Sequence, residues 1–288
     1  MIVHLVRRYP IWAFLVWFYS VGWAIAFIPY LAKRAYGMDL PMEWFIVAST
    51  LLGLFLPVIV VTRIVDGPEG LVTLQQRITR VAVNAGWYAI GVVLLPAVSI
   101  AVAVGTFGLP SVPLAAWLNA IVAGFFVATL VGCASTNLWE EAAWMGFVQA
   151  RLQARYPVLV AAVITGFLFM LQHVPLMVMQ NTGVLVPIVF FVVAVPFRAL
   201  MAWLYNRTGS LLVVGLVHAA GDAIAGGTLA GIGLLPRLYP DYDIGLFGII
   251  ANVILGLIVI AATRGRLGYS TRASTPPISA PALRRAAA

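Results

Sequence analysis

The chain has 288 residues, of which 63% are hydrophobic and only 9% are charged. Soluble domains are typically about 45–50% apolar and about 25% charged, so this composition excludes an ordinary water-soluble protein. The net charge of +8 does not indicate nucleic acid as a partner. The basic residues lie in short connecting segments and in the C-terminal tail, as expected beside anionic lipid. The single cysteine, Cys133, excludes an intrachain disulfide and a cysteine-based metal cluster.

Apolar segments of about twenty residues recur along the chain, and a helix of that length crosses about 30 Å of hydrocarbon. The segments are continuous rather than alternating, which favours helices over a β-barrel. The sequence therefore predicts an all-α fold, a polytopic membrane helix bundle of about eight transmembrane helices. We expect the spans near residues 11–32, 44–62, 87–107, 113–135, 158–178, 184–204, 211–233 and 246–263. An Ala-Ile-Ala stretch at 24–26 resembles a signal-peptide cleavage site, but the apolar segment continues past it, which favours a retained first span.

The spans define a transmembrane helical domain over residues 1–264. Between the second and third spans, residues 63–86 combine apolar and basic positions in a pattern that predicts an amphipathic interfacial helix. Residues 265–288 are rich in Pro, Ala, Ser and Arg, and we expect them to form a disordered basic tail.

Eight spans place both termini on the same side of the membrane. With the N-terminus in the cytoplasm, most of the Lys and Arg residues fall in cytoplasmic segments, as the positive-inside rule requires. We therefore expect a multi-pass protein of the plasma membrane whose N- and C-termini are both cytoplasmic.

Five ionisable residues lie inside or beside the apolar segments. Such groups cost at least about 2.5–3.5 kcal/mol each at membrane depth, so they are rare without a role. Their chemistry is complementary, because they combine carboxylates with imidazoles, and this makes them the candidate functional residues. They are Glu140, Glu141, His173, His218 and Asp222.

The first group follows three short polar residues, Ser135, Thr136 and Asn137. A continuous helix from 113 to 155 would be about 64 Å long, about twice the hydrocarbon core. We therefore expect a helix break near 135–137, where one of the three polar residues caps a new helix that carries the two glutamates in its first turn. The alternative is an ordinary helix start at the membrane interface with solvated carboxylates.

The second and third groups each have helical spacing. Phe169 and His173 are four residues apart, as are His218 and Asp222, so each pair shares one helix face. A histidine hydrogen-bonded in the core would explain the first pair, and a structural contact between two helices would explain the second. The small residues around His218 would allow a helix or a peptide backbone to approach closely.

Together these groups contain what peptide hydrolysis requires: a base that activates water, an acid for the leaving amine and donors for the oxyanion. A buried glutamate can serve as base and then as acid. Alternatively, a divalent metal such as Zn²⁺ could activate the water, with Glu140, His173, His218 and Asp222 as its ligands. The sequence has no His-Glu-x-x-His helix, so it lacks the common zinc-protease geometry.

The three groups resemble the three motifs of the CAAX protease and bacteriocin-processing (CPBP) family of intramembrane proteases. The family pattern is Glu-Glu-x-x-x-Arg, then Phe-x-x-x-His, then His-x-x-x-Asn or Asp. The likeness is centred on residues 113–233 and implies a cavity within the membrane where a lipidated or membrane-associated peptide is cleaved. It also implies that Glu140 and His173 activate the water, while His218 and Asp222 stabilise the oxyanion.

One position departs from the family pattern, because Met145 stands where the motif has arginine. Arg198, which lies within a span, could supply the missing charge from another helix, or it could extend to the cytoplasmic surface. The departure also leaves two alternative functions open. One is a catalytically silent family member that acts as a membrane scaffold or regulator. The other is a proton-coupled transporter, since buried Glu, His and Asp also form proton relays.

Overall fold

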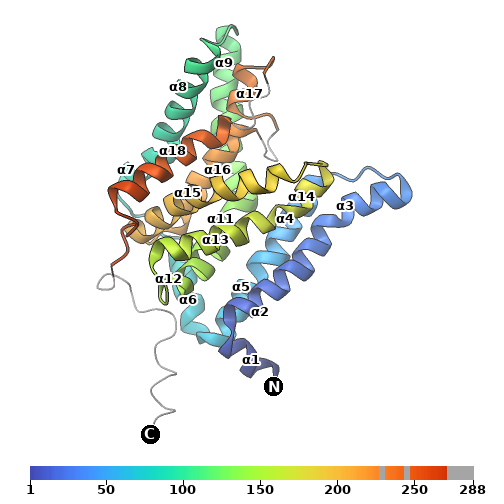
Figure 1. The fold of residues 1–288 in the computed structure, drawn as a ribbon, viewed down its shortest axis with the longest axis vertical. Coiled ribbons are helices and arrows are strands. Elements are labelled where there is room, and N and C mark those ends of the chain that lie inside the picture. Colours follow the sequence, from blue (N-terminus) through green and yellow to red (C-terminus); the bar gives the residue numbers. More distant parts are fainter. Residues whose placement is uncertain (227–230, 243–246, 271–288) are drawn as a thin grey trace.

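The computed structural model describes residues 1–226, 231–242 and 247–270. These residues form an all-helical bundle, with no β-strand in the described ranges (Figure 1). Within these described ranges, six helical segments are long and apolar enough to cross a membrane. They are Pro10–Tyr36, Met42–Val65, Ala85–Phe107, Leu114–Gln153, Val158–Met179 and Leu185–Thr208. Two shorter apolar helices, Leu211–Ala225 and Ile249–Ala262, lie where the seventh and eighth spans were expected, so the polytopic helical bundle is confirmed.

The segments divide into shorter helices. In the first part of the chain these are α1 (Ile2–Arg8), α2 (Pro10–Trp17), α3 (Trp23–Tyr36), α4 (Met42–Ala48), α5 (Leu56–Val65), α6 (Gly67–Ile78), α7 (Ala85–Ala89), α8 (Leu95–Phe107) and α9 (Leu114–Ile121). The remaining helices are α10 (Ala128–Gly132), α11 (Leu138–Ala143), α12 (Ala150–Gln153), α13 (Val158–Gln172), α14 (Val174–Met179), α15 (Leu185–Thr208), α16 (Leu211–Ala225), α17 (Leu234–Leu238) and α18 (Phe247–Ala262). Short π-helical segments join several of them: η1 (Phe18–Gly22), η2 (Ser49–Phe55), η3 (Ile90–Leu94), η4 (Val122–Val127), η5 (Cys133–Asn137) and η6 (Trp144–Gln149).

The helix break expected near 135–137 is wrong. Residues 114–153 form one continuous helical segment of 40 residues, and a π-helical turn at Cys133–Asn137 takes the place of the break. The short polar residues do not cap a new helix. The hydroxyls of Ser135 and Thr136 donate instead to the carbonyls of Val131 and Gly132 one turn earlier in the same helix. Such local bonds satisfy the hydroxyls without ending the helix.

The helix expected between the second and third spans is present as α6, which begins at Gly67 and ends at Ile78. Leu74 is buried on its inner face, and Gln75 and Gln76 are exposed on its outer face, so the helix is amphipathic. Of the tail predicted over residues 265–288, the part from 271 onward lies outside the described residues.

The core of the bundle is centred on Trp144, which is fully buried. Its ring meets Phe14 and Phe18 of the first segment edge-on at 5.8 and 6.0 Å between centroids, and Phe169 of α13 at 6.4 Å. Edge-to-face contacts at these separations are favourable beyond the area that they bury. The cluster therefore joins the N-terminal segment to the central helices that carry the candidate residues.

The helix α18 packs directly on α15, and Figure 1 shows these two helices beside each other. Gly256 makes the approach possible, because a Cβ built there would lie only 2.1 Å from the carbonyl oxygen of Pro196. Small residues allow two membrane helices to pack this closely. Gly105 of α8 differs, because a Cβ built there meets nothing within 4 Å.

We expect Gly256→Ala to lower the free energy of unfolding by about 1–3 kcal/mol, because the added methyl forces α18 away from α15. Gly105→Ala is the matched control, and there alanine should leave stability unchanged or raise it by up to about 1 kcal/mol through its higher helix propensity. Thermal unfolding of the two variants in detergent measures the difference. Equal melting temperatures would contradict the close packing.

Candidate active site

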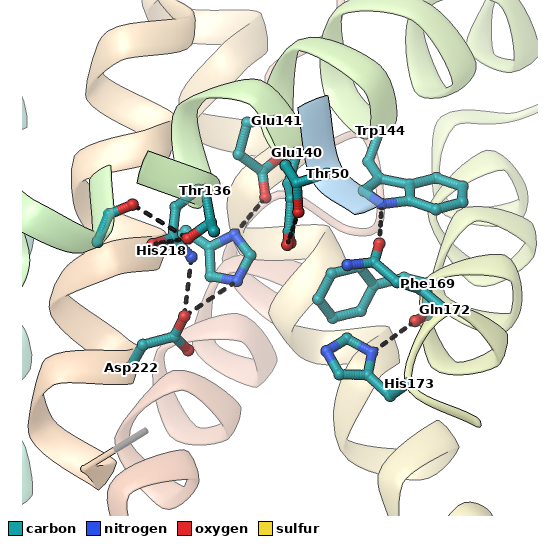
Figure 2. Close-up of polar contacts among 12 residues, drawn as sticks. Thr50, Thr136, Glu140, Glu141, Trp144, Phe169, Gln172, His173, His218 and Asp222 are labelled. Atoms are coloured by element: carbon teal, nitrogen blue, oxygen red, sulfur yellow. Dashed lines mark hydrogen bonds and ion pairs between the residues drawn. The ribbon is translucent and has the colours of Figure 1, made fainter. Parts of the chain in front are cut away.

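The two adjacent glutamates of α11 face different surroundings. Successive residues of a helix point about 100° apart, so Glu140 and Glu141 cannot share one environment. Glu141 is fully buried and turned toward α15 and α16, whereas Glu140 lies on the wall of a cavity. In Figure 2 the carboxylate of Glu141 contacts His218, whereas that of Glu140 lies beside Thr50. Glu141 therefore belongs to the interior of the bundle, and Glu140 belongs to the cavity wall.

Glu141 forms an ion pair with Arg198 of α15. Nη1 of Arg198 donates to Oε1 of Glu141 at 2.8 Å and Nη2 donates to Oε2 at 2.7 Å, and neither side chain is exposed. The guanidinium also lies over the ring of Phe169, 4.8 Å from its centroid. Two parallel bonds of this kind give the strongest and most directional Arg–carboxylate contact.

This ion pair resolves the question raised by Met145. Arg198 does not extend to the surface but contacts Glu141, so the hypothesis that it supplies the missing charge from another helix is confirmed. Met145 is fully buried in the apolar core. The glutamate pair therefore keeps a cationic partner although the position four residues after Glu141 carries no charge.

His218 of α16 is the next member of the same chain of contacts. Its Nδ1 lies 2.7 Å from Oε1 of Glu141, and its Nε2 lies 3.9 Å from Oδ2 of Asp222. With Nδ1 held by a carboxylate, the orientation of the ring is fixed and Nε2 is the nitrogen that faces the cavity. Arg198, Glu141 and His218 thus form a continuous path from the core to the cavity wall.

Asp222 lies one turn after His218, and 44% of its side chain is accessible. Nδ2 of Asn137 donates to its Oδ2 at 2.8 Å. This bond joins the π-helical turn of residues 133–137 to α16. Asn137, expected only as a helix cap, is therefore part of the candidate site.

His173 lies at the junction of α13 and α14. Its Nδ1 contacts the carbonyl oxygen of Phe169 at 2.9 Å, so Nε2 is again the free nitrogen. The ring of Phe169 contacts both histidines, with centroids 4.7 Å from His173 and 5.7 Å from His218 (Figure 2). One aromatic side chain therefore positions both imidazoles.

The candidate residues meet at a cavity of about 330 Å³. Glu140, His173, His218 and Asp222 all line it, and most of the other lining residues are apolar. Counting residues along straight, upright helices would have placed these groups at different membrane depths, so the shared cavity is a result that only the tertiary structure provides. Glu141 alone among the five candidates lies behind the wall.

Two residues that the sequence did not identify lie next to Glu140. Oγ1 of Thr50 in η2 is 3.5 Å from Oε1 of Glu140. Gln172 also lines the cavity, and its Oε1 accepts from Nε1 of Trp144 at 2.5 Å. Both are neutral polar residues in apolar segments, and no spacing rule connects Thr50 with a glutamate ninety positions later.

The four residues that would hold a metal ion are not arranged as a ligand set. Within the described part of the chain, no three His, Cys, Asp or Glu side chains are grouped so that they could hold a metal ion. The four residues come from α11, the end of α13 and α16. This arrangement of donor atoms therefore does not fit a resident metal ion.

We expect Arg198→Met to lower the free energy of unfolding by about 3–5 kcal/mol, because the carboxylate of Glu141 stays buried without a cation. Thermal unfolding in detergent measures the change, and Arg155→Met, at an exposed arginine, is the matched control. Adding Met145→Arg to Arg198→Met should recover part of the loss, since position 145 lies one turn from Glu141. An Arg198→Met protein as stable as the control would show that the ion pair contributes nothing.

Two comparisons with known proteins bear on this site. No curated protein matches the chain. Residues 122–224 match the family model described as type II CAAX prenyl endopeptidase Rce1-like, and this segment contains all five candidate residues together with Arg198. The resemblance noted in the sequence motifs is therefore confirmed independently. Over residues 122–224 the chain is therefore similar to the CAAX protease family.

Proposed function

We propose that the chain is an intramembrane endopeptidase that cleaves a membrane-associated or lipidated peptide or protein. The cleaved bond lies near the C-terminus or in the membrane-proximal part of the substrate. One observation carries the proposal: Glu140 and two histidines line a single, largely apolar cavity, and each histidine has Nδ1 held by an internal acceptor. Such an arrangement leaves one carboxylate and two Nε2 atoms for water and substrate.

In the proposed reaction, Glu140 takes a proton from a water molecule that His173 orients. The resulting hydroxide attacks the carbonyl carbon of the scissile bond and forms a tetrahedral oxyanion. When the carbon–nitrogen bond breaks, Glu140 returns the proton to the leaving amine, so protons and electrons balance. A glutamate that acts first as base and then as acid is an established pattern in enzymes.

The oxyanion is stabilised from α16. His218 in its doubly protonated form donates through Nδ1 to Glu141 and through Nε2 to the developing charge. The 3.9 Å between Nε2 and Asp222 is longer than a hydrogen bond, so this hydrogen is not already committed. An ionised carboxylate only accepts hydrogen bonds, so Asp222 takes part as a donor when it carries a proton.

The alternative of a catalytically silent scaffold or regulator rested on Met145. Since Arg198 supplies a cation to Glu141 from α15, that reason no longer applies. The alternative of a proton-coupled transporter uses the same buried groups and predicts flux rather than cleavage. The apolar cavity wall supports a peptide or lipidated substrate over a small polar solute.

We expect Glu140→Gln to reduce hydrolysis of a prenylated CAAX peptide by about 10²–10⁴-fold, because the amide cannot accept the proton of water. Purified protein in proteoliposomes and mass spectrometry of the peptide give the rate. Glu43→Gln, at an exposed glutamate, is the matched control and should keep full activity. If both variants cleave as wild type does, or if neither wild type nor control cleaves any membrane peptide, the proposal fails.

We also propose that the chain lies in the plasma membrane with both termini in the cytoplasm. This follows from the cytoplasmic excess of basic residues. Its partners would be membrane lipid and the peptide or lipidated protein substrate, with no nucleic acid.

The orientation can be tested because Cys133 is the single cysteine and is buried. In a Cys133→Ala background, a membrane-impermeant maleimide applied to intact cells should label Lys33→Cys but not His4→Cys, since the proposed orientation places Lys33, in the last turn of α3, on the external side. Permeabilised cells, in which both variants should react, provide the control. The opposite labelling pattern would reverse the orientation.

A further inference from the structure

The helix α18 contains one polar side chain, Asn252, in an otherwise apolar sequence. The residue is only 5% exposed. A primary amide removed from water costs free energy unless its oxygen and nitrogen both find hydrogen-bond partners. A single buried asparagine in a membrane helix therefore requires an explanation.

The usual explanation is a hydrogen bond that joins two helices. Oδ1 of Asn252, however, is buried and has no hydrogen-bond partner among the residues that the structure describes. Asn206 of α15 provides the contrast, because its Oδ1 accepts from Gln153 at 2.9 Å and its Nδ2 donates to the carbonyl of Leu267 at 3.0 Å. Asn206 joins neighbouring elements, whereas the acceptor of Asn252 is left unused.

The unpaired Oδ1 of Asn252 belongs to a side chain at the candidate active site. Asn252 lines the same cavity as Glu140, His218 and Asp222. It sits against Gly221, the residue next to Asp222: a Cβ at Gly221 would lie 2.7 Å from Nδ2 and 3.7 Å from Oδ1 of Asn252. The absence of a side chain at this position is what leaves space for the amide between α16 and α18.

We propose that Asn252 binds the main chain of the substrate, an inference that rests on the proposed function. Its Oδ1 accepts a hydrogen bond from a backbone N–H near the scissile bond, and its Nδ2 donates to a backbone carbonyl. A primary amide has one hydrogen-bond acceptor and two donors in a plane, so it can pair with the N–H and the carbonyl of a peptide group. The apolar part of a lipidated substrate has no donor or acceptor with which the amide could pair. Asn252 lies outside residues 122–224 and adds a binding residue from α18 to the site.

The test measures binding separately from cleavage. In a Glu140→Gln background, which removes the general base, a fluorescent farnesylated CAAX peptide is titrated into protein in detergent. Adding Asn252→Leu, which keeps the size but removes the amide, should raise Kd at least about tenfold, as expected when both hydrogen bonds of the amide are lost in a buried site. A series of peptides, each with one backbone nitrogen methylated, then identifies the N–H involved. Methylation at that position should weaken binding about tenfold in the Glu140→Gln protein that keeps Asn252. It should leave binding to the protein that also carries Asn252→Leu unchanged.

Thermal stability separates a binding role from a structural one. Asn252→Leu should leave the melting temperature unchanged or raise it, because a side chain with an unpaired buried acceptor is replaced by an apolar one. Asn206→Leu is the matched control and should lower the melting temperature while leaving Kd unchanged, because its amide is fully paired in the protein.

Failure of the Asn252 inference can be distinguished from failure of the proposed protease function. The inference is overturned if Asn252→Leu lowers the melting temperature and each methylated peptide loses as much affinity for the Asn252→Leu variant as for the protein that keeps Asn252. In that case the residue is structural. Absence of saturable peptide binding overturns it as well. If the peptide binds as expected but wild type does not cleave it, the binding role stands and the proposed catalytic function fails.

Discussion

The buried contact between Arg198 and Glu141 determines how the rest of the site is built. Taking two charges out of water is costly, and the cost is offset only when the geometry is good and the remaining polar atoms are paired. Here the carboxylate accepts from both Nη atoms of the arginine and also meets Nδ1 of His218, whereas Nε of Arg198 has no hydrogen-bond partner among the described residues. Because these three residues come from α15, α11 and α16, the helices must meet at one point, and this point forms one wall of the cavity.

The same constraint explains why two adjacent glutamates are useful. Glu141 is held from the core side, so the helical rotation of about 100° per residue turns Glu140 toward the cavity. The first carboxylate therefore remains available to water while the second orients a histidine. A site that needs one fixed and one reactive carboxylate obtains both from a single turn of helix.

Composition and local spacing predict much of this protein. The apolar segments identify the spans because each is a property of about twenty neighbouring residues, and helical spacing places His218 and Asp222 on one face. The expected break near 135–137 failed because the hydroxyls of Ser135 and Thr136 find acceptors inside their own helix, which residue type alone does not reveal. Whether Arg198 reaches the surface or pairs with Glu141, 57 positions away, depends on helix packing rather than on local pattern. The same holds for the contact between Asn137 and Asp222.

The continuous segment Leu114–Gln153 has a consequence for the lipid around the protein. Forty helical residues are about 60 Å long, whereas the hydrocarbon core is about 30 Å thick, so the segment must incline steeply or leave the bilayer. Its inclination then depends on the local thickness of the membrane, as for any helix under hydrophobic mismatch. Glu140 is fixed to this helix, so the acyl-chain length of the surrounding lipids contributes to the depth at which the carboxylate lies in the membrane.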